Sequence, residues 1–394
     1  MGLMSEYISR RLSAYDLEAE LLTLIKRYND HRKTHLLVMV GAIGKQIPDV
    51  ALNQEDFYTV ADMLSKVKGV TRKVDVYLET PGGSGEAAEE IVEFLRGNFE
   101  YVSFVISGEA KSAGTIMVMS SDDILMTETG SLGPIDAQVR IGRSTISAYD
   151  YMEWIEEKHK EAALKGRLNP FDATMVAQIN PGELRGVNHA LKFAEDLVGK
   201  WLKQYKFKHW SLTETRKSPV TDEMKAQRAN EIAQKMTNHG TWRSHGRSIK
   251  IKDLEAIGLK ITKVGDDPTL NDIVCRIQVV CRLLFTSTNV YKIFATADEK
   301  ILKSAVPMQE MPRIPKAPQS ADVAEVDHKC SQCGKGHKIY AKFTVNPKID
   351  QDFQSKGFIQ FPKTNRLTCS CGFEIDLGGI RNEIEMKTGL KVLD

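Results

Sequence analysis

Two short segments rich in small residues could carry chemistry. One is PGG at 81–83, which directly follows the run KVDVYLET, and the other is KSAGT at 111–115, which follows the run YVSFVIS after three residues. Glycine lets backbone N–H groups approach a bound carbonyl, because no side chain stands in the way. A serine at the start of a helix has a neighbouring N–H free to bind a developing oxyanion. Ser112 is therefore a candidate nucleophile, with the N–H groups of Gly83 and Ala113 as a candidate oxyanion hole.

The surrounding sequence predicts the elements that would position these segments. Short apolar runs bounded by glycine or polar residues predict strands at 35–44, 73–80, 101–107 and 122–129. Amphipathic stretches predict helices at 9–28, 55–67, 86–96 and 112–120. This alternation favours stacked βαβ units around a largely parallel, buried sheet. Neighbouring parallel strands end at one sheet edge, so the two segments can converge on one crevice.

The two segments also have a structural explanation. PGG alone reads as a turn, and Ser112 alone reads as a helix N-cap. Their occurrence after neighbouring strands favours a functional site over these separate roles.

The remaining chain predicts further parts. We expect an N-terminal helical segment at 1–34 and a main α/β domain at 35–303, with a charged helical insertion at about 148–237. The stretch 304–328 contains four prolines and few large apolar residues, which is typical of a linker. A small cysteine-bearing module follows at 329–394.

Three motifs together resemble a known family. PGGSG, KSAGT and the later GSLGPIDAQ are similar to the serine dehydrogenase proteinase family, a relative of the Clp protease proteolytic subunit and of signal peptide peptidase A. The resemblance covers roughly residues 35–264 and is most specific over 78–138. It implies a crotonase-like (Clp protease-like) α/β fold, serine peptidase chemistry on protein or peptide substrates, and a ring-like homo-oligomer.

The other two catalytic residues of the Clp subunit do not carry over directly. Where its histidine is expected, this chain has Asp136, 24 residues after Ser112. Where its aspartate is expected, it has His245, 13 residues before Gly258. Triads are defined by geometry rather than chain order, so the two roles can have exchanged positions. We therefore predict Ser112 as nucleophile, His245 as base and Asp136 as the residue that orients it.

Other residues compete for these roles. Asp136 can be a simple turn residue, and His245 a surface residue with His239 as its nearest competitor. A serine and lysine dyad, as in signal peptide peptidase A, would use a lysine some tens of residues after the serine. The lysines in that range are Lys158, Lys160 and Lys165. A lysine base must be desolvated, and these three lie in a highly charged run.

The C-terminal module carries a metal-ligand pattern. Cys330 and Cys333 form C-x2-C, and Cys369 and Cys371 form C-x-C after 35 intervening residues. Two cysteine pairs, each followed by glycine, predict a zinc ribbon in which four thiolates hold one structural Zn2+. His337 could replace one ligand, and a disulfide pair or free thiols are the alternatives. The ribbon could dock a partner.

The overall charge and the absence of certain motifs favour no special class of partner or cofactor. The 54 basic and 52 acidic residues leave a formal net charge of +2, which demands neither nucleic acid nor anionic lipid as partner. The sequence shows no transmembrane segment and no secretory signal at its start, so we predict a cytoplasmic protein. No G-x-G-x-x-G turn supports nicotinamide chemistry.

The sequence therefore predicts a serine peptidase acting through an acyl-enzyme on Ser112. The main alternative is a non-catalytic crotonase-like scaffold whose zinc ribbon binds a protein or nucleic-acid partner. Crotonase-type acyl-thioester chemistry uses a similar oxyanion hole, but it needs no nucleophilic serine.

Overall fold

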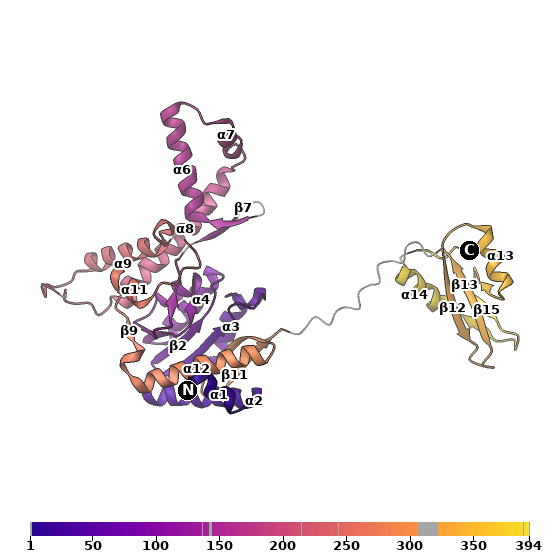
Figure 1. Cartoon of the computed structure of the whole chain (residues 1–394), viewed down its shortest axis with the longest axis horizontal. Helices are drawn as coiled ribbons and strands as arrows, with labels where there is room; N and C mark the ends of the chain where they lie inside the picture. The colour runs from indigo at the N-terminus through magenta and orange to yellow at the C-terminus, as the bar shows by residue number, and fades with distance from the viewer. Residues whose placement is uncertain are drawn as a thin grey trace. The chain divides into compact units, whose positions relative to one another are not determined.

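The chain folds into two compact units. The computed structural model describes residues 2–135, 137–141, 144–213, 215–242, 244–305, 322–388 and 390–393. The first unit comprises Met1–Val306 and the second Pro307–Asp394, and Figure 1 shows both.

A seven-stranded sheet forms the centre of the first unit, in the order β11-β10-β1-β2-β3-β5-β9. Five neighbouring strands are parallel, namely β1 (His35–Gly41), β2 (Lys73–Glu79), β3 (Tyr101–Ile106), β5 (Asp123–Met126) and β9 (Thr262–Lys263). At one edge β10 (Val290–Ala295) and β11 (Lys300–Ser304) run antiparallel to their neighbours. The predicted α/β class with a largely parallel sheet is confirmed.

Helices cover both faces of this sheet, because strand side chains alternate between them. Leu37 and Met39 of β1 face one core, and Leu36 and Val38 face the other. The first core is covered by α3 (Gln54–Met63), α4 (Gly85–Asn98), α5 (Ala113–Val118), α8 (Pro181–Trp201), α9 (Asp222–Thr237) and α11 (Ile251–Ile257). The second core is covered by α1 (Leu3–Ser9), α2 (Ala14–Arg32) and α12 (Pro268–Ser287).

Two short pairings lie beyond the carboxyl ends of the sheet strands. Strand β4 (Glu109–Ala110) pairs in parallel with β6 (Ser131–Leu132), which brings KSAGT beside GSLGP. A hairpin of β7 (Gln138–Ile141) and β8 (Ser144–Ser147) leads from there into the helical insertion. The β4–β6 pairing, together with the bridge between Thr80 and Ala110, holds the loops that follow β2 and β3.

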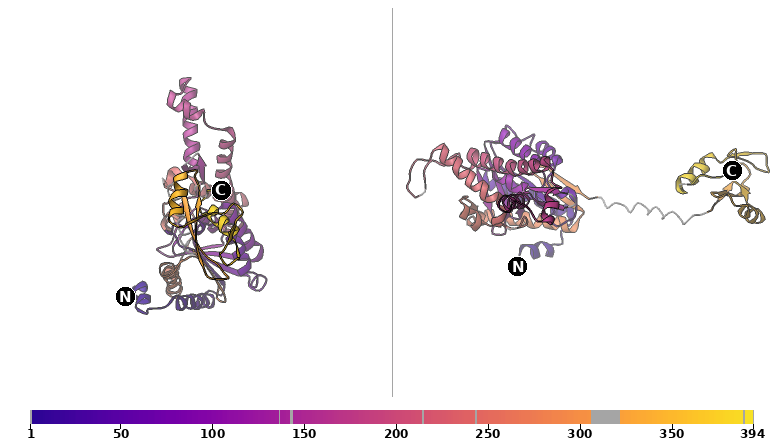
Figure 2. Two further views of the ribbon diagram at one scale, coloured as in Figure 1. Left: turned by 90° about the vertical axis from the view of Figure 1, so that its right-hand side faces the viewer. Right: turned by 90° about the horizontal axis from the view of Figure 1, so that it is seen from above.

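The helical insertion consists of α6 (Ala148–Lys165), α7 (Pro170–Val176), α8 and α9, with a π-helical turn at Leu202–Lys206 and the short α10 (His239–Trp242) after them. Helices α6 and α7 project from the rest of the unit in Figures 1 and 2. The carboxyl half of α8 returns to the core, where Ala194, Leu197 and Trp201 are buried. Helix α8 therefore connects the projection to the core.

The second unit is a small β-rich module. Strand β12 (Val323–Lys329) pairs antiparallel with β13 (Gly336–Lys342), which pairs in parallel with β14 (Ile359–Gln360). A second hairpin joins β15 (Arg366–Thr368) and β16 (Glu374–Asp376), and α13 (Pro347–Ser355) and α14 (Gly378–Thr388) complete the unit. Strand β12 occupies the end of the stretch predicted as a linker. None of the described helices is long and apolar enough to cross a lipid bilayer.

A buried ion pair ties the sheet edge to α3. The Lys292 ammonium of β10 lies 2.7 Å from Asp56 Oδ2, and both side chains are almost fully buried. Lys303 of β11 contacts the other oxygen of Asp56 at 3.3 Å, with its side chain 22% exposed. Desolvation lowers the pKa of Lys292, and the hydrogen bond that Lys292 donates to Asp56 counteracts this shift.

Replacing Lys292 by methionine should lower the free energy of unfolding of the first unit by about 3–5 kcal/mol, because Asp56 loses its buried partner. Lys303→Met is the matched control and should cost under about 1 kcal/mol, because Lys303 is partly hydrated. Urea unfolding followed by tryptophan fluorescence measures both, since all four tryptophans lie in the first unit. Equal losses from the two variants would contradict this assignment.

Candidate active site and cysteine cluster

Ser112 lies on a sharp turn between β4 and α5. Its φ of 48° and ψ of −116° are unusual for a residue with a side chain, and such backbone strain costs about 1–3 kcal/mol. Hydrogen bonds on either side hold the turn, from Lys111 N to Thr80 O at 3.0 Å and from Gly114 N to Lys111 O at 2.8 Å. The surrounding chain thus imposes the conformation that presents the Ser112 side chain.

The PGG loop packs directly against this turn. Gly82 and Gly83 have φ values of 102° and 145°, which favour glycine. A Cβ on Gly82 would lie 2.7 Å from the Ser112 Cβ, and one on Gly83 would lie 2.3 Å from Leu52 O. Leu52 N donates to Gly82 O at 2.7 Å, and Ser84 N donates to Leu52 O at 2.9 Å. Only glycine fits between these segments.

Ser112, Gly83, Ala113 and His245 line one cavity of about 700 Å3. Within the described residues, the N–H groups of Gly83 and Ala113 donate no hydrogen bond, so both can bind a ligand. The sequence-predicted oxyanion hole, nucleophile and base therefore share one cavity.

Asp136, the predicted orienting residue, lies outside the described residues. Its two neighbours, Ile135 and Ala137, line the cavity. His239 begins α10, and its side chain also lies outside the described part of the structure.

A short turn carries His245 to the cavity. Arg247 N donates to Ser244 O at 3.1 Å, which closes the turn around His245 and Gly246. Just beyond it, Ile249 and Leu132 exchange two backbone hydrogen bonds of 2.9 and 3.0 Å. A residue 133 positions after Ser112 in sequence thereby reaches the same cavity.

Helix α8 forms a wall of the cavity that sequence reasoning missed. It contributes His189, Ala190, Phe193 and Ala194. The Phe193 ring lies close to the start of α4, since a Cβ on Gly85 would be 3.2 Å from Phe193 Cε1. The helical periodicity of α8 was visible in the sequence, but nothing local indicated which of its turns would face the loops that carry Gly83 and Ser112.

Glu86, in the first turn of α4, lines the cavity and brings a carboxylate to it. Its own N–H and the Ser84 hydroxyl lower the pKa of this carboxyl. Glu86 is therefore ionised at neutral pH.

The candidate lysines of a dyad lie elsewhere. Lys158 pairs with Asp172 at 2.8 Å and with Glu161 at 3.2 Å, and the hydrogen bond to Asp172 is the largest cause of its raised pKa. Lys160 and Lys165 form surface ion pairs within α6. The described residues that line the cavity include no lysine. This arrangement disfavours a lysine base, because a base must lose its proton near neutral pH.

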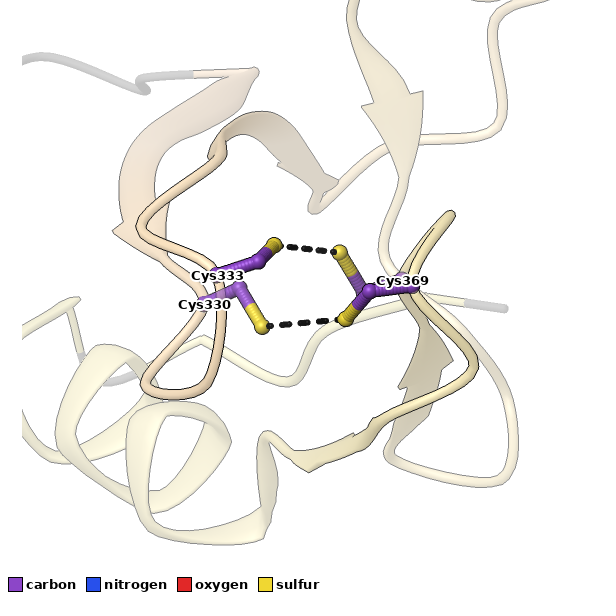
Figure 3. Close-up of side chains that lie close together, drawn as sticks. Cys330, Cys333 and Cys369 are labelled. Carbon is purple, nitrogen blue, oxygen red and sulfur yellow. Dashed lines mark hydrogen bonds between the residues drawn. The ribbon is translucent and has the colours of Figure 1, made fainter.

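The second unit brings its four paired cysteines together. The sulfur atoms of Cys330, Cys333, Cys369 and Cys371 all lie within 4.8 Å of one another. Figure 3 shows Cys330 and Cys333 on one side of the cluster and Cys369 on the other. The sulfur of Cys330 lies 3.8 Å from that of Cys371, and the sulfur of Cys333 lies 3.6 Å from that of Cys369. Four sulfurs about 2.3 Å from one ion at tetrahedral angles have similar separations, so the cluster fits Zn2+.

His337 contacts the cluster from outside. Its Nε2 lies 3.3 Å from Cys369 Sγ, so it is placed to hydrogen-bond a ligand rather than to replace one. The Cys371 N–H, together with the His337 contact, lowers the pKa of Cys369 to about 5. Cys369 is thus prepared to bind as a thiolate.

The first unit has a ClpP-like α/β fold. Residues 7–165 match the family model described as ClpP-like SDH-type serine proteinase. The resemblance drawn from PGGSG and KSAGT is confirmed. The family match ends before the second unit and does not bear on the cysteine cluster.

Two uncharacterized proteins of Methanocaldococcus jannaschii are similar in sequence. One is 24% identical over 188 residues, 48% of this chain and 51% of the relative, and the other is 23% identical over 128 residues, 31% and 44% respectively. The chain thus spans about half the length of these curated relatives.

Similar solved structures include a mutant of the 1510-N membrane-bound stomatin-specific protease, with 13% identity, a TM-score of 0.33 and coverage of 57% of this chain and 79% of that one. A ClpP1 mutant from Listeria monocytogenes has 10% identity, a TM-score of 0.32 and coverage of 61% and 98%.

Replacing Gly83 by alanine should lower the free energy of unfolding of the first unit by about 1–3 kcal/mol, because its φ is unfavourable and its Cβ would meet the Leu52 main chain. Gly97→Ala is the matched control in α4, where open space surrounds the new methyl group. It should be neutral or stabilise by up to about 1 kcal/mol. Urea unfolding distinguishes the opposite signs.

Proposed function

We propose that this chain hydrolyses peptide bonds through an acyl-enzyme on Ser112. The single observation that carries the proposal is the strained Ser112 turn, packed against the Gly82-Gly83 main chain at a cavity that His245 also lines. Strain of this kind persists where the surrounding structure imposes it, and it is concentrated at functional sites. The family match to serine proteinases supports the same chemistry.

The proposed reaction has two steps. His245 takes the Ser112 proton as Oγ attacks the substrate carbonyl, and the N–H groups of Gly83 and Ala113 stabilise the oxyanion. The tetrahedral intermediate collapses as His245 gives its proton to the leaving amine. Water, deprotonated by His245, then attacks the ester carbonyl, and His245 returns the proton to Ser112 Oγ as the ester bond breaks and the carboxylic acid product leaves. Asp136 is proposed to orient the imidazole and stabilise its charged form.

The cavity suggests which peptides enter. Ile116, Ile135 and Phe193 provide apolar surface beside Ser112. A peptide with an apolar side chain next to the scissile bond would bury that side chain there. Glu86 adds a negative charge, which favours neutral or basic neighbouring residues over acidic ones.

A fluorophosphonate probe should label the wild-type protein, and Ser112→Ala should abolish the label, because the probe forms a covalent bond with an activated serine. Ser84→Ala is the matched control, since Ser84 is a second serine at the same cavity, and it should retain the label. Labelling is measured by in-gel fluorescence and mass spectrometry. Persistent absence of Ser112-dependent labelling would favour the non-catalytic scaffold.

His245→Ala should slow labelling by about 100-fold or more, because the general base is lost. His189→Ala tests the other histidine at the cavity and should change the rate less than about threefold. A reversed order of the two effects would assign the base to His189.

We also propose that the four cysteines hold one structural Zn2+. The tetrahedral arrangement would be complete, which leaves no open position for catalysis. So small a module has little core of its own, and the metal would contribute much of its stability.

Purified protein should contain about one zinc per chain, and Cys330→Ser should lose it because one of four thiolates is missing. Cys275→Ser is the control, since Cys275 lies in α12 of the first unit and is not one of the four clustered cysteines. Strong chelation should make the second unit sensitive to limited proteolysis and leave the tryptophan-monitored melting of the first unit unchanged. Metal-free, fully reduced protein with a protease-resistant second unit would contradict the proposal.

The resemblance to the Clp protease subunit also bears on assembly. We propose a ring-like homo-oligomer with the second unit docking substrates or partners, and a cytoplasmic location remains a prediction.

A further inference from the structure

Lys111, the residue before the nucleophile, makes contacts that the proposed reaction does not use. Its side chain is buried, with the residue only 6% exposed. Nζ donates to Ser248 Oγ at 2.9 Å, to Arg247 O at 3.2 Å and to Gly246 O at 3.4 Å. Two carbonyls and one hydroxyl thus accept the three N–H bonds of one ammonium. All three acceptors directly follow His245 in sequence.

The path of the Lys111 side chain is fixed along its length. Its main chain is held by Thr80 and Gly114, as described above for the Ser112 turn. Further out, a Cβ on Gly133 would lie 2.7 Å from the Lys111 Cδ and 3.3 Å from its Cα. The lysine therefore runs through space that Gly133 leaves open. The segments KSAGT, GSLGP and SHGRS meet along this one side chain.

The turn that carries His245 has separate anchors on its far side. Beyond the turn, Ile249 pairs with Leu132, and Lys250 Nζ donates to Thr129 O and Gly130 O at 2.8 and 3.1 Å. Those contacts hold residues 249 and 250. In the part of the chain that the structure describes, Lys111 is the side chain that binds the carbonyls of both Gly246 and Arg247.

Lys111 itself is poorly placed to act as the base. Its Nζ is directed to the 246–248 segment, and Lys111 is not among the described residues that line the cavity. Any effect of Lys111 on the reaction would therefore act through His245, which directly precedes this segment.

We propose that Lys111 is a positioning residue that fixes the turn bearing His245 relative to Ser112. Lys111 directly precedes Ser112, and its side chain binds the residues that follow His245. This one side chain therefore links the segments that carry the nucleophile and the base. This proposal rests on His245 being the base. Displacing a reacting group by about 1 Å can cost about 100-fold in rate, so a secure link has catalytic value.

The test compares reaction rates with and without Lys111→Met. The comparison is made first with Ser112 and His245 both present, and then in a His245→Ala background. With His245 present, we expect the fluorophosphonate labelling rate and the kcat for an apolar peptide to fall about 10- to 100-fold, with KM changed less than about threefold. Without His245, the same substitution should slow labelling less than about threefold, because residues that act as a unit are not additive. Equal losses in both backgrounds would overturn the proposal.

Hydrogen exchange of residues 244–249 provides a readout independent of activity. Lys111→Met should accelerate exchange there by about tenfold or more, and Ser248→Ala, which removes only one acceptor, should do so less. Lys206→Met is the matched control, since Lys206 is another buried lysine that donates to a carbonyl, that of Asp122. It should leave exchange of 244–249 unchanged.

The two readouts separate the hypotheses. Unchanged exchange in Lys111→Met would overturn the anchoring role whatever the activity. If labelling does not depend on Ser112, the proposed function fails, and the exchange result still decides whether Lys111 holds the turn.

Discussion

The close approach of main chain at Gly82 and Gly83 constrains the rest of the first unit. This loop runs between Leu52 and Ser112, and neither side leaves space for a Cβ. Parallel strands β2 and β3 bring the two loops to one sheet edge, and helices α4 and α5 begin directly after them. The strained serine is tolerated because the surrounding contacts leave its turn little alternative. Packing of the whole sheet thus determines the position of one hydroxyl group.

Much of this arrangement could be predicted from local sequence. The runs at 35–44, 73–80 and 101–107 are apolar and short, and each ends in glycine or small polar residues, so strands and their loops were recognisable. The order of those loops along a parallel sheet then placed Ser112 near Gly83. The resemblance to the Clp subunit suggested His245, which stands where the aspartate of that subunit is expected. The structure places His245 on the same cavity, while its role stays a proposal.

Other features depend on contacts that no local pattern encodes. Lys111 reaches acceptors 135 to 137 residues away, and a single lysine in sequence looks like surface charge. The α8 wall depends on how the insertion returns to the core, which is set by burial of Trp201 and its neighbours rather than by the residues at the cavity. Strand β12 was hidden because its alternation of apolar and charged residues is short and follows a proline-rich stretch.

Helix α8 has a consequence for how such a protein diversifies. The loops that carry Gly83 and Ser112 lie against each other through their main chains and leave no space for an added Cβ, whereas α8 is an inserted helix that lines the same cavity. Evolution, or a protein engineer, can therefore vary His189, Ala190 and Phe193 without touching the main chain around Ser112. Substrate selectivity would then depend on the inserted helices, and the reactivity of Ser112 on the loops that the sheet positions.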